Sequence, residues 1–250
     1  MLPSMNDSSF TLVAENPHFL VVAKRAGLPT VPLAKETGKK TLLSEVGAYF
    51  KEVLAPMGPH GHEGGVMHRL DTETCGLVLI ARDFSTFDTL RESQMRGNFK
   101  KTYMAATKIS ERDDGYPPFP AAEEDTNWIL ESRFRVYGSG HKVVRPVTEA
   151  SSSVVQGKGG KVTYRTAVEL VGTSDEGILL YCCRLTRGFR HQVRCHLAWS
   201  SHAILGDQLY GGEPRTTLHL AAVTLGFNDP ESEVYREFVW PDPPEWTSIT

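Results

Sequence analysis

The pattern of hydrophobic and polar residues along the chain predicts a protein rich in β-strands. Short apolar runs bounded by polar or turn-forming residues are typical of buried strands. The region 10–24 contains two such runs on either side of an Asn16-Pro17 turn. Further strands are expected at 77–81, 100–109, 133–137, 161–170 and 177–185.

Other segments have apolar residues at helical spacing. We expect an amphipathic helix over 42–54, a second over 83–95 with Asp83 or Ser85 as its N-cap, and a third over 192–199. Residues 202–205 are expected to be extended, and 217–225 to form a helix or a strand. These elements together favour an α+β fold with a mixed, mainly antiparallel sheet and flanking helices.

The chain shows no repeat and no linker long enough to require two domains. Residues 1–9 are expected to be a disordered tail. Prolines, serines and glycines crowd residues 110–160, which we interpret as an irregular excursion with one short strand at 133–137. The sequence therefore predicts a single domain over residues 10–250.

Composition places the chain among ordinary soluble globular proteins, since 40% of its 250 residues are hydrophobic and 23% are charged. It contains no apolar stretch long enough to cross a bilayer and no secretory signal at its N-terminus. We therefore expect a cytoplasmic location and no membrane partner. The four cysteines form no C-x-x-C pair, so reduced and mostly buried thiols are expected.

Charge is unevenly distributed, although the formal net charge is only -3. The segment 184–196 holds four arginines, two histidines and no acid. If a helix begins near Arg190, Arg190 and Arg194 share one face of it. Arginines fixed at the start of a helix are suited to binding a carboxylate or a phosphate, whereas a solvated charged face is the ordinary alternative.

The acid that draws most attention is Asp71, in the segment HRLDTETCGLVLIAR at 68–82. It follows the basic pair His68-Arg69 and lies in the turn that leads into the buried strand predicted at 77–81. A carboxylate held near a core strand and beside an arginine is a candidate for chemistry, and the alternative is an acid that caps a turn. Tyr103, after Lys100-Lys101, is either a core aromatic residue or a platform on which a base stacks.

Histidines at 60, 62 and 68 could bind a metal together with Glu63, as in a metal-dependent hydrolase. A glycine-rich loop orients such ligands poorly, however, and the helical H-E-x-x-H pattern is missing. We favour a mobile loop near a charged substrate. No phosphate-binding G-x-x-x-x-G-K-[ST] and no dinucleotide-binding G-x-G-x-x-G occurs after a strand.

Taken in order, these segments resemble the pseudouridine synthases of the RluA type, from about residue 15 to about residue 228. Arg25 stands where the family has proline, Cys75 where it commonly has serine, and Gly188-Phe189-Arg190-His191 where it commonly has Gly-Arg-Thr-His. The resemblance rests on five segments: 19–24 with Gly27-Leu28; His68-Arg69-Leu70-Asp71 with Thr74-Cys75-Gly76-Leu77; Lys101-Thr102-Tyr103; His191-Gln192-Val193-Arg194-Cys195-His196-Leu197; and Ile204-Leu205-Gly206-Asp207 with Tyr210-Gly211 and Leu218-His219-Leu220.

The resemblance implies the family's fold, with a central catalytic cleft, and the isomerisation of a uridine in RNA to pseudouridine. It implies that Asp71 is the nucleophile, that Tyr103 packs on the target base and that Arg194 is the cation matched to Asp71. Contacts with RNA fall to His68, Arg69, Arg187, Arg190, His191 and Gln192.

The same resemblance implies neither metal nor organic cofactor. The expected partner is a stem-loop of ribosomal or transfer RNA, bound by a monomer. No space precedes residue 10 for the small S4 RNA-binding domain of many relatives, so we expect the catalytic domain to bind RNA itself. An alternative from another class is a non-catalytic RNA-binding protein with the same fold.

Overall fold

The structure, a computed structural model, describes residues 9–32, 38–120 and 127–248. The predicted tail thus falls outside the described residues except for Ser9. The chain divides into two compact units. The first comprises residues up to Lys101 together with Ala221–Pro243, and the second comprises Thr102–Leu220 together with the residues from Pro244 onward.

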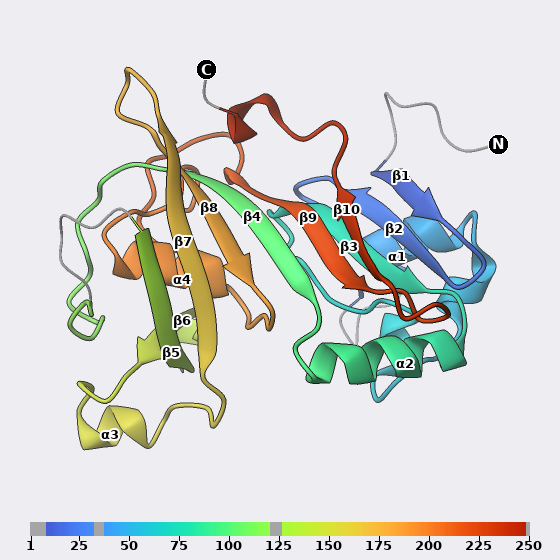
Figure 1. Cartoon of the computed structure of the whole chain (residues 1–250). Helices are drawn as coiled ribbons and strands as arrows, with labels where there is room; N and C mark the ends of the chain where they lie inside the picture. Colours follow the sequence, from blue (N-terminus) through green and yellow to red (C-terminus); the bar gives the residue numbers. More distant parts are fainter. Residues whose placement is uncertain (1–8, 33–37, 121–126, 249–250) are drawn as a thin grey trace. The chain divides into compact units, whose positions relative to one another are not determined.

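The first unit contains a mixed sheet (Figure 1). Its order is β1-β2-β3-β9, with β10 paired to β9. Strands β1 and β2, β2 and β3, and β9 and β10 pair antiparallel, whereas β3 and β9 pair parallel. Every residue of β2 and β3 is buried, which explains their continuous apolar sequences. The strands are β1 (Phe10–Glu15), β2 (Phe19–Lys24), β3 (Cys75–Ala81), β9 (Leu220–Asn228) and β10 (Tyr235–Val239).

Helices of the first unit lie beside these strands, as Figure 1 shows for α1 (Leu42–Gly47) and α2 (Phe84–Met95). Asp83 caps α2 by accepting a hydrogen bond from the Thr86 N–H, as expected. The predicted helix over 42–54 was wrong in length, because α1 ends at Gly47 and a short 3-10 helix follows at Lys51–Leu54. The chain turns back there, and Leu54 packs so closely on Gly47 that any β-carbon at that position would collide with it.

The second unit contains the strand order β4-β8-β7-β5-β6, with antiparallel pairing of β8 with β7, β7 with β5 and β5 with β6. Helix α4 (Gln192–Trp199), fully buried, contacts β6 and β7. The strands are β4 (Lys100–Thr107), β5 (Asn127–Tyr137), β6 (Val143–Val147), β7 (Tyr164–Thr173) and β8 (Leu179–Leu185). Shorter elements are α3 (Ser153–Gln156) and two 3-10 helices, Ser139–His141 and Glu245–Thr247.

The predicted α+β class with a mixed, mainly antiparallel sheet is confirmed. The interpretation of 110–160 as holding one short strand was wrong, because β5 is 11 residues long and β6 and α3 follow it. In β5 alternate residues are buried, but one of them is Ser132, whose polarity hides the alternation in the sequence. The segment 217–225, for which the sequence predicts either a helix or a strand, contributes to strand β9. Among the described residues, no helix has the length and apolar character needed to span a membrane.

Candidate active site

Asp71 lies half-buried in the loop that leads into β3, in the first unit. The segment after β2 holds the backbone on both sides of it. The Thr30 hydroxyl donates to the Leu70 carbonyl (2.7 Å) and accepts from the Leu70 N–H (3.1 Å). The Gly27 N–H donates to the Thr72 carbonyl (2.9 Å). The position of the Asp71 backbone is therefore fixed by residues more than forty positions earlier in the chain.

A buried lysine, Lys24, completes this support at the end of β2. Its ammonium donates to the carbonyls of Thr72 (3.0 Å), Leu28 (2.7 Å) and Arg25 (2.9 Å). Burial lowers the pKa of Lys24 to about 8, against the opposite effect of the nearby Cys75, Glu73 and Asp71. The sequence interpretation did not select Lys24, although a charged residue that closes a continuous apolar strand was a usable signal.

Gly76, the second residue of β3 after this loop, has a backbone φ of +123°. A β-carbon there would collide with the backbone of Ala222, its partner in the parallel β3–β9 pair. Only glycine allows this close approach together with the left-handed backbone. The Cys75-Gly76 pair of the sequence motif thus brings the Asp71 loop directly against β9.

Two residues predicted to bind RNA precede Asp71. Burial lowers the pKa of His68 well below its ordinary value, and the charge of Lys101 lowers it further. The His68 ring is therefore neutral, and its Nε2 accepts from the Leu79 N–H (3.4 Å). Arg69 is exposed and its guanidinium donates to Glu63 (2.9 Å). Of the two, Arg69 is the one that carries a charge able to pair with a phosphate.

The other predicted site residues belong to the second unit. Tyr103 is a buried residue of β4. Arg194 lies in the first turn of α4, where its Nε and Nη2 donate to the two carboxylate oxygens of Asp207 at 2.7 and 2.8 Å. The Asp207 side chain is 0% exposed and that of Arg194 6%, so this is a buried, bidentate ion pair.

Asp207, which belongs to the fifth segment of the sequence resemblance, is a site residue that the sequence prediction missed. It lies in a turn after Gly206, which has a φ of +80° and whose β-carbon position is filled by the Thr217 backbone. The Leu209 N–H donates to Asp207 Oδ1 (3.2 Å). The turn therefore fixes the carboxylate, and the carboxylate fixes the direction of the Arg194 guanidinium.

The basic segment before α4 differs from the expected arrangement. Arg190 and Arg194 do not share a helix face, because α4 begins only at Gln192 and His191 has a left-handed backbone (φ +57°). Arg190 is exposed and its Nη2 donates to the carbonyl of His141 at 2.7 Å. His191 Nδ1 lies 3.1 Å from the Tyr210 hydroxyl. Arg187 lies in the exposed turn that precedes them.

Gln192 and His196 form a buried polar network that anchors α4. The Gln192 amide nitrogen donates to the Thr166 hydroxyl (2.8 Å) and the Arg165 carbonyl (3.0 Å), and its oxygen accepts from the Phe189 N–H (2.9 Å). His196 lies between the hydroxyls of Thr166 (2.9 Å from Nδ1) and Ser132 (3.0 Å from Nε2). The amide of Gln192 is thus engaged inside the protein, and its predicted contact with RNA stays a prediction.

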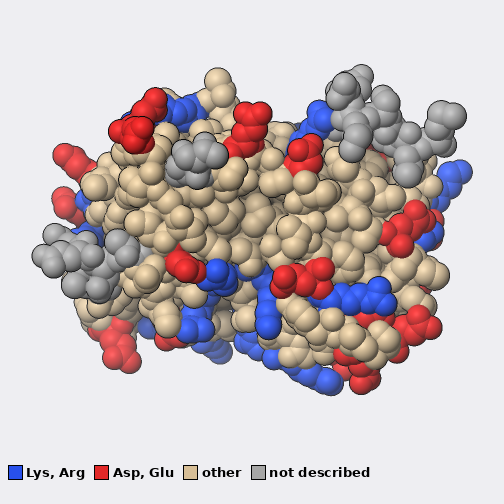
Figure 2. All heavy atoms as spheres, turned by 45° about the horizontal axis from the view of Figure 1, so that its top comes forward, with Lys and Arg blue, Asp and Glu red and all other residues tan. Residues whose placement is uncertain are grey.

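Charged side chains of both signs are interspersed on the face shown in Figure 2. Several arginines of the second unit are matched by acids, such as Arg184 with Glu169 (2.6 Å). The exposed arginines predicted to bind RNA lie in two segments: Arg69 in the loop before β3, and Arg187 and Arg190 in the segment before α4.

Metal binding gains no support from the part of the chain that the structure describes, which holds no group of three metal-ligating side chains. The rings of His60 and His62 lie 6.0 Å apart, centroid to centroid. All four cysteines are buried, as expected from the sequence.

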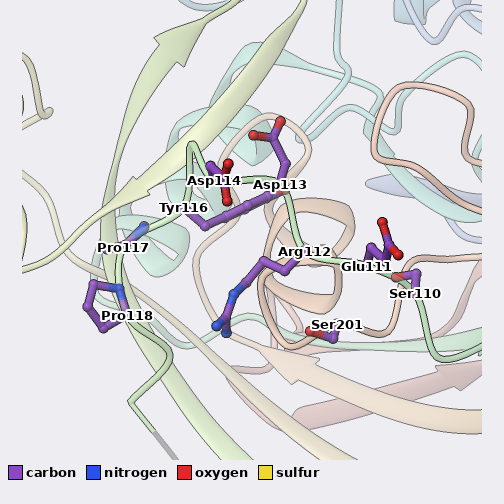
Figure 3. Close-up of a pocket in the computed structure, with 9 residues that line it drawn as sticks. All are labelled: Ser110, Glu111, Arg112, Asp113, Asp114, Tyr116, Pro117, Pro118 and Ser201. Carbon is purple, nitrogen blue, oxygen red and sulfur yellow. The ribbon is translucent and has the colours of Figure 1, made fainter.

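A polar hollow of about 570 Å³ lies in the second unit (Figure 3). Three acids, Glu111, Asp113 and Asp114, contribute to its lining, and Asp113 accepts a hydrogen bond from Arg145 (2.6 Å). None of the predicted site residues lines it. Its acidic lining is poorly suited to a nucleic-acid phosphate.

A comparison with known families decides the relationship. The family model described as RNA pseudouridylate synthase matches residues 18–199. The chain belongs to this family. The matched range includes the Asp71 loop, Tyr103 and Arg194, so it covers the first four of the five segments on which the sequence resemblance rests, and the fifth, at 204–220, lies beyond it.

Relatives of this pseudouridylate synthase family member include "Ribosomal large subunit pseudouridine synthase D" of Nitrosomonas europaea, 27% identical over 202 residues. That alignment covers 80% of this chain and 49% of the relative. "RNA pseudouridine synthase 2, chloroplastic" of Oryza sativa subsp. japonica is 28% identical over 211 residues. That alignment covers 74% of this chain and 43% of the relative. The chain spans about half the length of the curated relatives it matches.

Two solved human structures share the fold. "Human RNA Pseudouridylate Synthase Domain Containing 1" superposes with a TM-score of 0.69 at 16% identity and covers 97% of this chain and 87% of that one. For "Human RNA Pseudouridylate Synthase Domain Containing 4" the TM-score is 0.64 at 19% identity, with coverage of 95% and 90%. At these identities the likeness supports the fold alone.

Proposed function

We propose that the protein is an RNA pseudouridine synthase that isomerises a specific uridine, with Asp71 as its nucleophile. The observation that carries the proposal is the support of the Asp71 loop. Lys24, Gly27 and Thr30 all hold the backbone next to a half-buried acid. An acid that merely capped a turn would need no such support, whereas a nucleophile must be held in one position.

The proposed reaction breaks the bond between uracil N1 and ribose C1′ and forms a bond between C5 and C1′. The proton on C5 leaves and N1 gains one, so the reaction consumes no co-reactant. The Asp71 carboxylate either forms a covalent intermediate or assists glycosidic cleavage directly. The target base must leave the stack to reach the carboxylate, as in other enzymes that act on a base.

Residues of both units have roles in this proposal. Tyr103 packs on the target base and Arg194, oriented by Asp207, is the cation that favours the ionised form of a carboxylate. Arg69, Arg187, Arg190 and His191 hold the displaced RNA backbone, with His68 and Gln192 as further contacts from the same two segments. The reaction needs neither metal nor organic cofactor.

Ribosomal and transfer RNA are the proposed substrates, and the name of the Nitrosomonas relative, which mentions the large ribosomal subunit, favours ribosomal RNA. We propose that the protein acts in the cytoplasm as a monomer.

The proposal is tested by mapping pseudouridines in ribosomal and transfer RNA from a deletion strain. At least one site should be lost, and wild-type protein but not Asp71→Ala should restore it. If no site is lost, the proposed activity is wrong. If both proteins rescue the growth or assembly phenotype equally, a non-catalytic RNA-binding role is the better account.

A further inference from the structure

Lys101 is a buried cation that has no assigned role in the fold or in the proposed reaction. Only 7% of its surface is exposed. Over the first six residues of β4 every second residue is buried, so Lys101 and Tyr103 face the same side of the strand, while Lys100 and Thr102 face the other. The lysine therefore stands two residues from the tyrosine proposed to pack on the target base, on the same side.

The described residues offer this ammonium no counter-charge. Among them, no acidic side chain forms an ion pair with Lys101, and burial is the one cause that lowers its pKa, to about 8. Two other lysines, Lys24 and Lys100, do have partners for their ammonium groups. The Lys24 ammonium donates to three carbonyls, and Lys100 is exposed and lies over the Tyr235 ring at 4.9 Å.

An unpaired charge in the protein interior is destabilising, and an apolar side chain of similar length would fill the same space at lower free energy. His68, the neighbour whose pKa the Lys101 charge lowers, is neutral and lies three residues before Asp71 in the supported loop. The unpaired ammonium thus lies beside the loop of the proposed nucleophile. A group with this placement and no internal partner is suited to an anion supplied from outside.

We propose that Lys101 binds a backbone phosphate of the substrate RNA, next to the nucleotide whose base packs on Tyr103. This rests on the proposed function, which supplies the RNA. Phosphates are the anionic groups of that substrate, and an ammonium is a compact charge that binds a phosphate without the fixed geometry of a guanidinium.

The test compares wild-type protein with Lys101→Met and, as the matched control from the opposite face of β4, Lys100→Met. The probe is an in vitro transcript of the source organism's large ribosomal RNA. The Kd of each protein for this transcript is measured at salt concentrations from about 50 to about 200 mM. Lys101→Met should weaken binding about tenfold at the lowest salt. It should also reduce the slope of log Kd against log salt by about one. Lys100→Met should change both much less.

Thermal unfolding gives the second readout. Because Met removes an unpaired buried charge, the Tm of Lys101→Met should equal or exceed that of wild type. A clear fall in Tm would overturn the inference, since it would show that Lys101 serves the fold. Binding within twofold of wild type, with an unchanged salt slope, would overturn it as well. Failure of wild-type protein to form pseudouridine would instead count against the proposed function, because the binding measurement needs no turnover.

Discussion

Single residues in this protein derive their properties from partners that are distant in sequence. Arg194 is an example, since its direction is set by Asp207 through two hydrogen bonds in a buried environment. A buried ion pair adds little net stability compared with well-packed apolar residues, but the loss of one partner leaves an uncompensated charge. We therefore infer that the main effect of the Arg194–Asp207 pair is to orient the Arg194 guanidinium.

Replacing Asp207 with asparagine tests this account. Asp207→Asn should lower the free energy of unfolding by about 3 to 5 kcal/mol, because it removes the buried carboxylate charge that accepts two hydrogen bonds from the Arg194 guanidinium. Denaturant unfolding monitored by circular dichroism measures the effect. The control is Glu213→Gln, a partly exposed acid near the same turn that pairs with Lys108 and Arg215, which should cost much less. Equal losses in the two variants would contradict the assigned role.

Gly76 provides a second test at the scale of one residue. Gly76→Ala should destabilise the protein by more than about 2 kcal/mol, for two reasons. The added methyl group would collide with the Ala222 backbone, and alanine is strained at the positive φ of this position. Gly177→Ala is a matched control, since Gly177 has a φ of +73° with nothing within 4 Å of its β-carbon position. The control should show only the backbone cost of about 1 kcal/mol. Thermal unfolding of both variants decides, and a smaller loss for Gly76→Ala than for Gly177→Ala would refute the close-approach argument.

At the scale of elements, α4 is held by polar groups as much as by apolar ones. His196 bridges Ser132 of β5 and Thr166 of β7, and burial lowers its pKa to about 3. Each ring nitrogen faces a hydroxyl, so the neutral ring can donate on one side and accept on the other. The helix that carries Arg194 is thereby fixed against two strands.

The buried neutral ring predicts a loss of stability in acid. Below pH 6.5 the unfolded chain binds a proton at His196, whereas the folded protein does not until about pH 3. Stability should therefore fall as the pH drops through this window, by about 1.4 kcal/mol per pH unit once well below 6.5. Denaturant unfolding at pH 7, 6 and 5 should show a shallower fall for His196→Gln than for wild type. Identical slopes would exclude His196 as a source of the effect.

Elements could be predicted from sequence where local pattern and burial agree. Strands β2 and β3 are buried on both faces, so their runs are continuously apolar, and Asp83 gave a local signal for the start of α2. The length of β5 was missed because Ser132 faces inward and is satisfied by His196. The early end of α1 was missed because it depends on Leu54 packing against Gly47, which helical spacing does not reveal.

At the scale of the whole molecule, the sequence motifs identified the family and the acid on which the proposed chemistry depends. They did not reveal the residues that position it. Lys24 reaches Thr72 across 48 positions and Thr30 reaches Leu70 across 40, and no local pattern predicts such pairs.

The measurement that tests the central claim most directly is tritium release from RNA labelled at C5 of uridine. Formation of the new bond at C5 expels the hydrogen on that carbon, so an active enzyme transfers tritium to water. Transcripts of ribosomal and transfer RNA from the source organism serve as substrates, and Asp71→Asn is the control. We expect release by wild-type protein, at most one tritium per modified uridine, and none above background by Asp71→Asn. Equal release by the two proteins, or none by either from any of these RNAs, would contradict the assignment of Asp71 as the nucleophile of an RNA pseudouridine synthase.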